Sequence, residues 1–211
     1  MVRAGLSQDR ARFERWLAEW KDHTWSHSGP RGWARLQVAD ADVHERTRLI
    51  LAAPARDGLS RLATVAESVR AQRDLHNRCR IRIGEESLML HEAGGGWLEI
   101  ADWTTIDEKT VRTLARATRP KAGVRLDGEL AAIISGVPDN PFVRICELLA
   151  ASRLYEAVAN ELDDVTDWLC FELSNAGVGR TQIARHAQVS HLTVVRRISR
   201  ARRGAWQRGT G

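Results

Sequence analysis

The side chains best suited to recognise another molecule lie near the C-terminal end of the sequence. Between Leu173 and Gly211 there are eight arginines and no aspartate or glutamate. Guanidinium groups bind phosphate and the acceptor edge of guanine, and imidazole and hydroxyl groups exchange hydrogen bonds with other base edges. The predicted base contacts are His191, Thr193 and Arg196. The predicted phosphate contacts are Arg180, Arg185, Ser190, Arg197, Arg200, Arg202 and Arg203, with Arg208 in a tail that could follow the backbone or enter a minor groove.

The positive charge is local to this segment. The whole chain has a formal net charge of +5, so the +8 carried by residues 173–211 leaves −3 for residues 1–172. A basic segment on an otherwise slightly acidic chain favours one docking face for a polyanion over general attraction.

Two short helices are expected to position these side chains. Ile183 and Ala184 lie on the first, Val189 falls in a turn, and Val194 and Ile198 recur four residues apart on the second. These five residues can close a small core between crossing helices. Because Ser190 stands where the second helix would begin, its hydroxyl is expected to cap the free backbone amides there.

The same pattern occurs earlier in the chain. Shifted by 83 residues, 88–119 aligns without gaps onto 171–202. The matched pairs include Leu90 with Leu173, Gly94 with Gly177, Gly96 with Gly179, Ile100 with Ile183, Ala101 with Ala184, Thr110 with Thr193 and Val111 with Val194. The repeat predicts a second pair of short helices. It replaces the hairpin that residues 80–83 and the glycines at 94–96 would otherwise indicate.

Both copies resemble the helix-turn-helix of serine-recombinase tails, response-regulator output domains and the promoter-reading regions of sigma factors. The resemblance rests on Ile-Ala, a turn, a β-branched residue and Thr-Val, at 100–111 and at 183–194. It implies a tri-helical DNA-binding fold for each copy. One departure concerns the turn position that is usually glycine, where this chain has Thr105 and Gln188. A positive φ is less favourable for these residues, so a looser or differently wound turn is expected.

The first copy is electrically neutral. Residues 93–119 contain four acidic and four basic side chains, so this copy gains little nonspecific attraction to phosphate. It could still form a second DNA site through Glu108, Lys109, Arg112 and Thr113. The alternative is a structural or dimerising role, in which Thr105 and Glu108 form a capping box and contact no base.

The remaining sequence predicts a mainly α protein with a tryptophan-rich N-terminal region. Ser7 could cap a helix in which Phe13, Trp16, Leu17 and Trp20 form one stripe. A buried core explains this stripe better than a base-stacking platform does. Trp25 and Trp33 are expected in a loop, and further helices are expected over 42–53 and from Leu59 to about His76.

Four regions are predicted along the chain. They are an N-terminal helical region (1–78), the first helix-turn-helix (79–120), a linker with a short helix near 126–134 (121–141), and the second helix-turn-helix (142–211) with supporting helices over 142–159 and 161–174.

Catalytic and metal-binding patterns are weak, so the chain is not expected to be an enzyme or to need a cofactor. His23 and His27 lie four residues apart but lack a third ligand. The acidic residues Glu161, Asp163, Asp164 and Asp167 are interpreted as a solvated helix face. Three cysteines without paired spacing, no signal peptide and no long apolar run favour a reducing cytoplasm, with association to the nucleoid.

These observations predict a sequence-specific binder of double-stranded DNA, most simply a transcriptional regulator of a bacterium, phage or plasmid. A DNA-binding subunit of a replication, partition or transposition complex and a sigma-like factor are the alternatives. The expected partners are duplex DNA, a second copy of the chain in a homodimer, or another protein held through residues 1–78. No membrane contact is expected.

Overall fold

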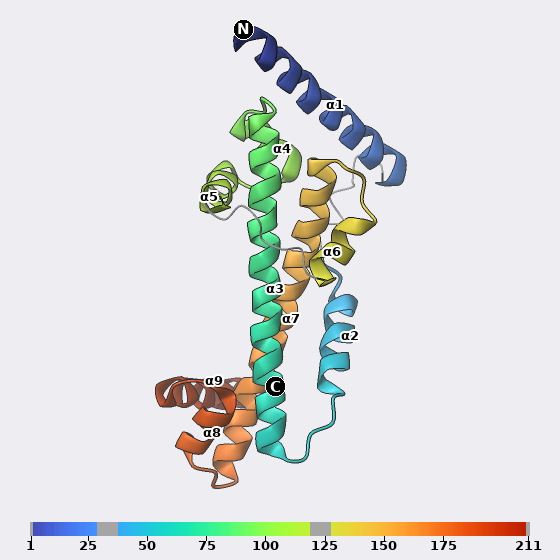
Figure 1. Cartoon of the computed structure of the whole chain (residues 1–211). Helices are drawn as coiled ribbons and strands as arrows, with labels where there is room; N and C mark the ends of the chain where they lie inside the picture. Colours follow the sequence, from blue (N-terminus) through green and yellow to red (C-terminus); the bar gives the residue numbers. More distant parts are fainter. Residues whose placement is uncertain (1, 29–37, 119–127, 210–211) are drawn as a thin grey trace. The chain divides into compact units, whose positions relative to one another are not determined.

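The computed structural model describes residues 2–28, 38–118 and 128–209, and within these ranges the chain is helical without a strand (Figure 1). The mainly α fold predicted from the sequence is therefore confirmed. The helices are α1 (Val2–Ser28), α2 (Asp40–Leu51), α3 (Gly58–Glu92), α4 (Trp97–Thr104), α5 (Glu108–Thr118), α6 (Gly128–Ser135), α7 (Pro141–Asn175), α8 (Arg180–Ala187) and α9 (His191–Gly209). Among these, no helix is long and apolar enough to cross a membrane.

The helices belong to two compact units, each built from two separate stretches of the chain. Unit 1 contains residues 1–38 and 75–153, and unit 2 contains residues 39–74 and 154–211. The four consecutive regions predicted from the sequence are corrected here. The proposed boundary after residue 78 lies inside α3, and the supporting helices predicted over 142–159 and 161–174 are one helix, α7.

The internal repeat is confirmed by the backbone. The bounds of α7 follow those of α3 by 83 residues, and the bounds of α8 follow those of α4 by the same shift. Gly94 and Gly177, which are equivalent, both have positive φ, at 88° and 81°. The repeat therefore begins at residues 58 and 141, well before the aligned segments. Sequence alignment does not reveal this earlier part, because residues 58–87 share only Arg61, Arg70 and Asn77 with their equivalents.

The aromatic stripe of α1 forms part of the core of unit 1. Phe13, Trp16 and Trp20 are buried, and the Phe13 ring meets Phe142 edge-on with 5.6 Å between centroids. The prediction that these rings are core residues is confirmed. Two details differ, because α1 begins at Val2, ahead of Ser7, and extends through Trp25, while Trp33 lies outside the described residues.

The turn between α3 and α4 is closed tightly by α1. Arg10 donates hydrogen bonds to the Gly94 carbonyl at 3.0 Å and to both carboxylate oxygens of Glu99. Gly95 lies directly against the Phe13 ring. A Cβ atom added at Gly95 would overlap this ring and would lie 2.9 Å from the Leu90 carbonyl oxygen. In unit 2 the equivalent position is Val178, which shows that only the contact with α1 requires glycine here.

Gly95→Ala is expected to destabilise unit 1 by about 1–3 kcal/mol, because the added methyl group overlaps Phe13 and cannot be accommodated without moving α1. Urea denaturation followed by circular dichroism measures the effect. Gly96→Ala is the matched control, since its Cβ would meet only Glu99, at 3.9 Å. Equal stabilities of the two variants would show that α1 does not pack against this turn as described.

Candidate nucleic-acid interface

The helix-turn-helix of unit 2 is held by a small apolar core. Ile183, Ala184, Val194 and Ile198 are buried with Leu62, Ala66, Cys170 and Ala187, and Val189 packs against them. The five core residues predicted from the sequence are thus confirmed. Leu62 and Ala66 come from α3, so α8 and α9 pack against this long helix.

The turn in each copy adopts the left-handed conformation without glycine. Gln188 has φ 54° and Thr105 has φ 56°. After Gln188, the Val189 amide donates to the Ala184 carbonyl at 3.1 Å. The looser turn expected from the missing glycine is not seen, because Thr105 and Gln188 themselves adopt the left-handed backbone conformation that glycine favours.

The N-terminus of α9 is capped as predicted. The Ser190 Oγ accepts a hydrogen bond from the Thr193 amide at 3.1 Å and lies 2.8 Å from the Thr193 hydroxyl. In the first copy the cap is Asp107, whose carboxylate accepts from the Thr110 amide at 2.9 Å and has its pKa lowered mainly by the side-chain hydrogen bond with Thr110. The predicted capping box between Thr105 and Glu108 is therefore wrong, and Glu108 pairs with Arg112 at 2.9 Å.

Ser190→Ala is expected to cost about 1 kcal/mol, because the Thr193 amide loses its acceptor at the start of α9. Chemical denaturation measures this loss. Ser190→Asp should keep the stability, since a carboxylate caps equally well, while its negative charge should weaken binding to any polyanion. A variant Ser190→Ala as stable as the parent chain would contradict the capping role.

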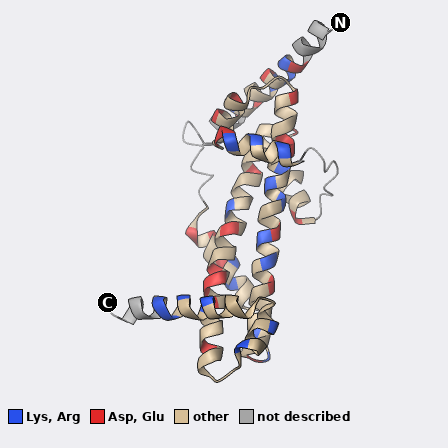
Figure 2. Ribbon diagram, turned by 90° about the vertical axis from the view of Figure 1, so that its left-hand side faces the viewer, with Lys and Arg blue, Asp and Glu red and all other residues tan. Residues whose placement is uncertain are grey.

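The exposed surface of α8 and α9 carries unpaired positive charge. Arg180 and Arg185 on α8, and Arg196, Arg202 and Arg203 on α9, are exposed and form no ion pair or hydrogen bond with any residue that the structure describes. Figure 2 shows basic residues recurring along α9, which has no acidic residue. His191 is exposed at the first turn of α9, whereas Thr193 is half-buried beside Ser190. The side chain of Arg208 lies outside the described residues.

The prediction that Arg197 contacts phosphate is wrong. It is only 8% exposed, and its guanidinium donates to Asp167 at 2.6 Å and to Asp163 at 2.8 Å. Burial by itself would lower the pKa of Arg197, but the hydrogen bonds with these two carboxylates raise it, so the group stays charged inside unit 2. Arg197 therefore joins α9 to α7 and is not available to a phosphate.

Two of the acidic residues on α7 also differ from their prediction. Asp163 and Asp167 are not part of a solvated face, since both bind Arg197 and their side chains are 17% and 8% exposed. Burial raises the pKa of Asp167 more than the hydrogen bond from Arg197 lowers it. Arg200 also pairs with Asp167, at 2.8 Å, but keeps 53% of its side chain exposed. Arg200 is thus a weaker candidate for phosphate contact than its neighbours Arg202 and Arg203.

The equivalent surface of unit 1 is less available. Arg112 is paired with Glu108, and the Thr113 hydroxyl donates to the Lys109 carbonyl at 2.7 Å. Lys109 and Arg112 remain exposed, so the four residues proposed as a second DNA site do lie on one helix, α5, but with their charges partly balanced.

One exposed apolar residue in this region, Leu192, was not among the predicted contacts. Leu192 has 57% of its surface exposed between His191 and Thr193, in the first turn of α9. A leucine two residues after a helix cap, outside the apolar repeat of the helix, is the signal that could have identified it. The side chains of His23 and His27, considered as metal ligands, lie outside the described residues.

Comparison with known proteins does not identify the chain. No protein-family model, curated protein or solved structure matches it.

Proposed function

We propose that unit 2 binds double-stranded DNA through α8 and α9. The observation that carries this proposal is the group of five exposed arginines without described partners, placed around a capped helix-turn-helix. An exposed guanidinium that no carboxylate neutralises is free to replace a counterion at a phosphate. Two crossing helices of this kind present the second helix to a major groove.

The first turns of α9 would enter the groove. His191 and Arg196 are exposed on this part of the helix and would face base edges, and Leu192 would contact a thymine methyl group. Arg180 and Arg185 on α8 would hold phosphates on one side, and Arg202 and Arg203 would follow the backbone further along. Thr193 would contribute less than its sequence position suggests, because its hydroxyl is already bonded to Ser190.

The buried ion pairs would position this surface. Arg197 binds Asp163 and Asp167 on α7, and Arg70 on α3 donates to the Ala187 carbonyl at the end of α8, at 3.2 Å. These contacts fix both short helices to the long helices of unit 2. Such fixed orientation favours sequence-specific recognition over loose electrostatic attachment, and transcriptional regulation is the simplest role for it.

Selection from a pool of random duplexes tests the proposal. The full chain is expected to enrich one sequence motif, and footprinting should show protection of that motif. A palindromic motif bound at two chains per duplex would indicate a homodimer, whereas a single asymmetric site bound by one chain would indicate that the monomer suffices. A pool that shows no enrichment over successive rounds would contradict specific binding.

A further inference from the structure

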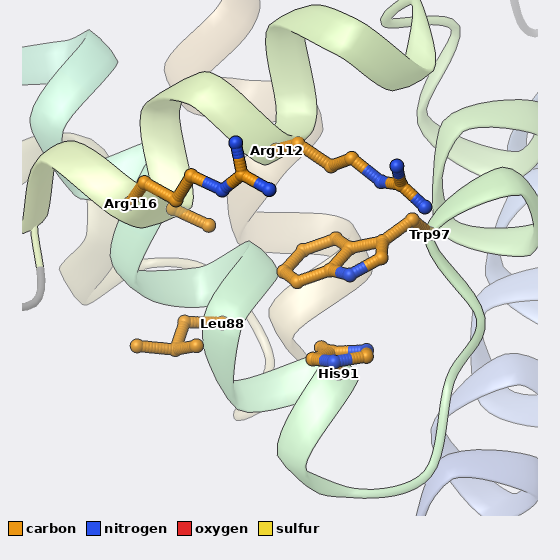
Figure 3. Close-up of a pocket in the computed structure, with 6 residues that line it drawn as sticks. Leu88, His91, Trp97, Arg112 and Arg116 are labelled. Atoms are coloured by element: carbon orange, nitrogen blue, oxygen red, sulfur yellow. The ribbon is translucent and has the colours of Figure 1, made fainter.

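A small pocket lies within unit 1, beside the neutral helix α5. It has a volume of about 150 Å³ and is lined by Leu88, His91, Trp97, Arg112, Ala115 and Arg116 (Figure 3). These residues come from the end of α3, the start of α4 and from α5, where Arg112 and Arg116 are exposed and Ala115 is buried. An apolar cavity of about this volume is large enough to hold benzene. The pocket therefore fits a ligand with one planar ring.

One wall of the pocket is aromatic and rigid. The rings of His91 and Trp97 are stacked, with 3.9 Å between centroids and 25° between their planes. The Nδ1 of His91 lies 2.8 Å from the Gly95 carbonyl oxygen, which can only accept, so Nδ1 donates and the imidazole is held in place. Leu88 and Ala115 add apolar surface. An indole supported in this way offers a planar ligand a preformed stacking surface.

The other wall is positively charged. Arg112 and Arg116 extend from α5 toward Trp97, one helical turn apart (Figure 3). Arg116 forms no ion pair or hydrogen bond with a described residue, whereas Arg112 is shared with Glu108. None of the six described lining residues is acidic. Two guanidinium groups over an aromatic wall select for negative charge, and Arg favours the planar geometry of a carboxylate.

Four of the residues that line the pocket differ from their equivalents in the second copy of the repeat. The equivalents of Leu88 and Ala115 are Phe171 and Ile198, which are larger and pack in or against the core of unit 2. The equivalents of Arg112 and Arg116 are Val195 and Ser199. Both the space and the positive charge of the pocket are thus specific to the first copy, and the core of a helix-turn-helix does not require either.

We propose that unit 1 binds a small aromatic carboxylate in this pocket, with the ring against Trp97 and the carboxylate held by Arg116 and Arg112. The site is separate from the DNA contact proposed for unit 2, and the two can be tested independently. A bound ligand would bridge α3, α4 and α5 of unit 1.

Isothermal titration of the full chain with benzoate tests the proposal, with inorganic phosphate as a probe of negative charge without a ring and benzylamine as a probe of the same ring with a positive charge. Benzoate is expected to bind with a Kd on the order of 1 mM, as suits a ligand of this size, and the other two at least about tenfold more weakly. Arg116→Gln should weaken benzoate binding about tenfold through loss of a charged hydrogen bond. Ala115→Ile, which copies Ile198, should block the pocket.

Arg196→Gln in unit 2 is the control and should bind benzoate as the parent chain does. The proposal is overturned if benzoate does not bind, or if phosphate or benzylamine binds as tightly. It is also overturned if Arg116→Gln leaves benzoate affinity unchanged. Because Arg116 is exposed, this variant is expected to fold normally, so it decides the matter even if Ala115→Ile is unstable. Duplex binding that depends on Arg116, without benzoate binding, would assign this surface to DNA.

Discussion

Arg197→Ala is expected to lower the free energy of unfolding of unit 2 by about 2–4 kcal/mol. The substitution removes the buried partner that Asp163 and Asp167 share, and leaves Asp163 with the exposed Arg73 and Asp167 with the half-exposed Arg200. Loss of the arginine also removes the buried hydrogen bonds between α9 and α7, of which the Arg200–Asp167 pair remains. Thermal and urea denaturation, followed by helix content, measure the effect on the full chain.

The neighbouring residue provides the control for this prediction. Arg196 is exposed and has no described partner, so Arg196→Ala should change stability by less than about 0.5 kcal/mol. Replacing Asp167 by Asn should destabilise the unit in the same way as the change at Arg197, though less, because Asp163 remains paired. Equal stability of Arg196→Ala and Arg197→Ala would contradict the prediction that the ion pairs of Arg197 with α7 stabilise the position of α9.

For the direct contact with DNA the order is expected to be reversed: Arg196→Ala should remove a contact, whereas the buried Arg197 makes none. Arg196→Ala is expected to weaken binding to the selected duplex by about 1–3 kcal/mol, which corresponds to roughly 5- to 150-fold in Kd. The reason is loss of a guanidinium on the exposed side of α9 that we propose faces the base edges. Fluorescence anisotropy with the labelled duplex measures the change.

The effect of Arg196→Ala should also depend on sequence. If Arg196 contacts a base, its removal lowers affinity for the selected site more than for an unrelated duplex, so discrimination between the two falls. An equal loss on both duplexes would place Arg196 on a phosphate, and no loss on either would remove it from the interface.

The helix-turn-helix units could be predicted from the sequence because their signals are local. Val194 and Ile198 share a face at helical spacing, Ser190 stands at a cap position, and the shift of 83 residues repeats the pattern at Ile100 and Ala101. Each of these features depends on residues a few positions apart. The structure accordingly confirms the core, the cap of α9 and the repeat.

The pairing of Arg197 was harder to predict, although the sequence contains a signal for it. Val194, Arg197, Ile198 and Ala201 fall at helical spacing on one face, so Arg197 belongs to the buried side of α9. Asp163 and Asp167 likewise lie four residues apart on α7. What the sequence does not reveal is that these two faces meet, because more than 30 residues separate Arg197 from Asp163.

The extent of α3 was missed for a related reason. The sequence predicts a helix that ends near His76 and an alternating segment at 80–83, and the boundary after residue 78 falls between them. In unit 1, however, Glu86 is fully buried and pairs with Arg144 on α7 at 2.8 Å and with Arg82 at 2.6 Å. Paired charges can occupy a core position that a periodicity argument reserves for apolar side chains.

The dependence of duplex affinity on salt, compared between two matched triple variants, is the most direct test of DNA binding by unit 2. One variant replaces Arg180, Arg185 and Arg203 by Gln, and the other replaces Lys109, Arg112 and Arg116 of unit 1 by Gln. The slope of log K against log salt should fall by about 2–3 in the first variant, which loses up to three counterion-releasing contacts, and stay unchanged in the second. An unchanged slope in the first variant, or an equal fall in both, would contradict the proposal.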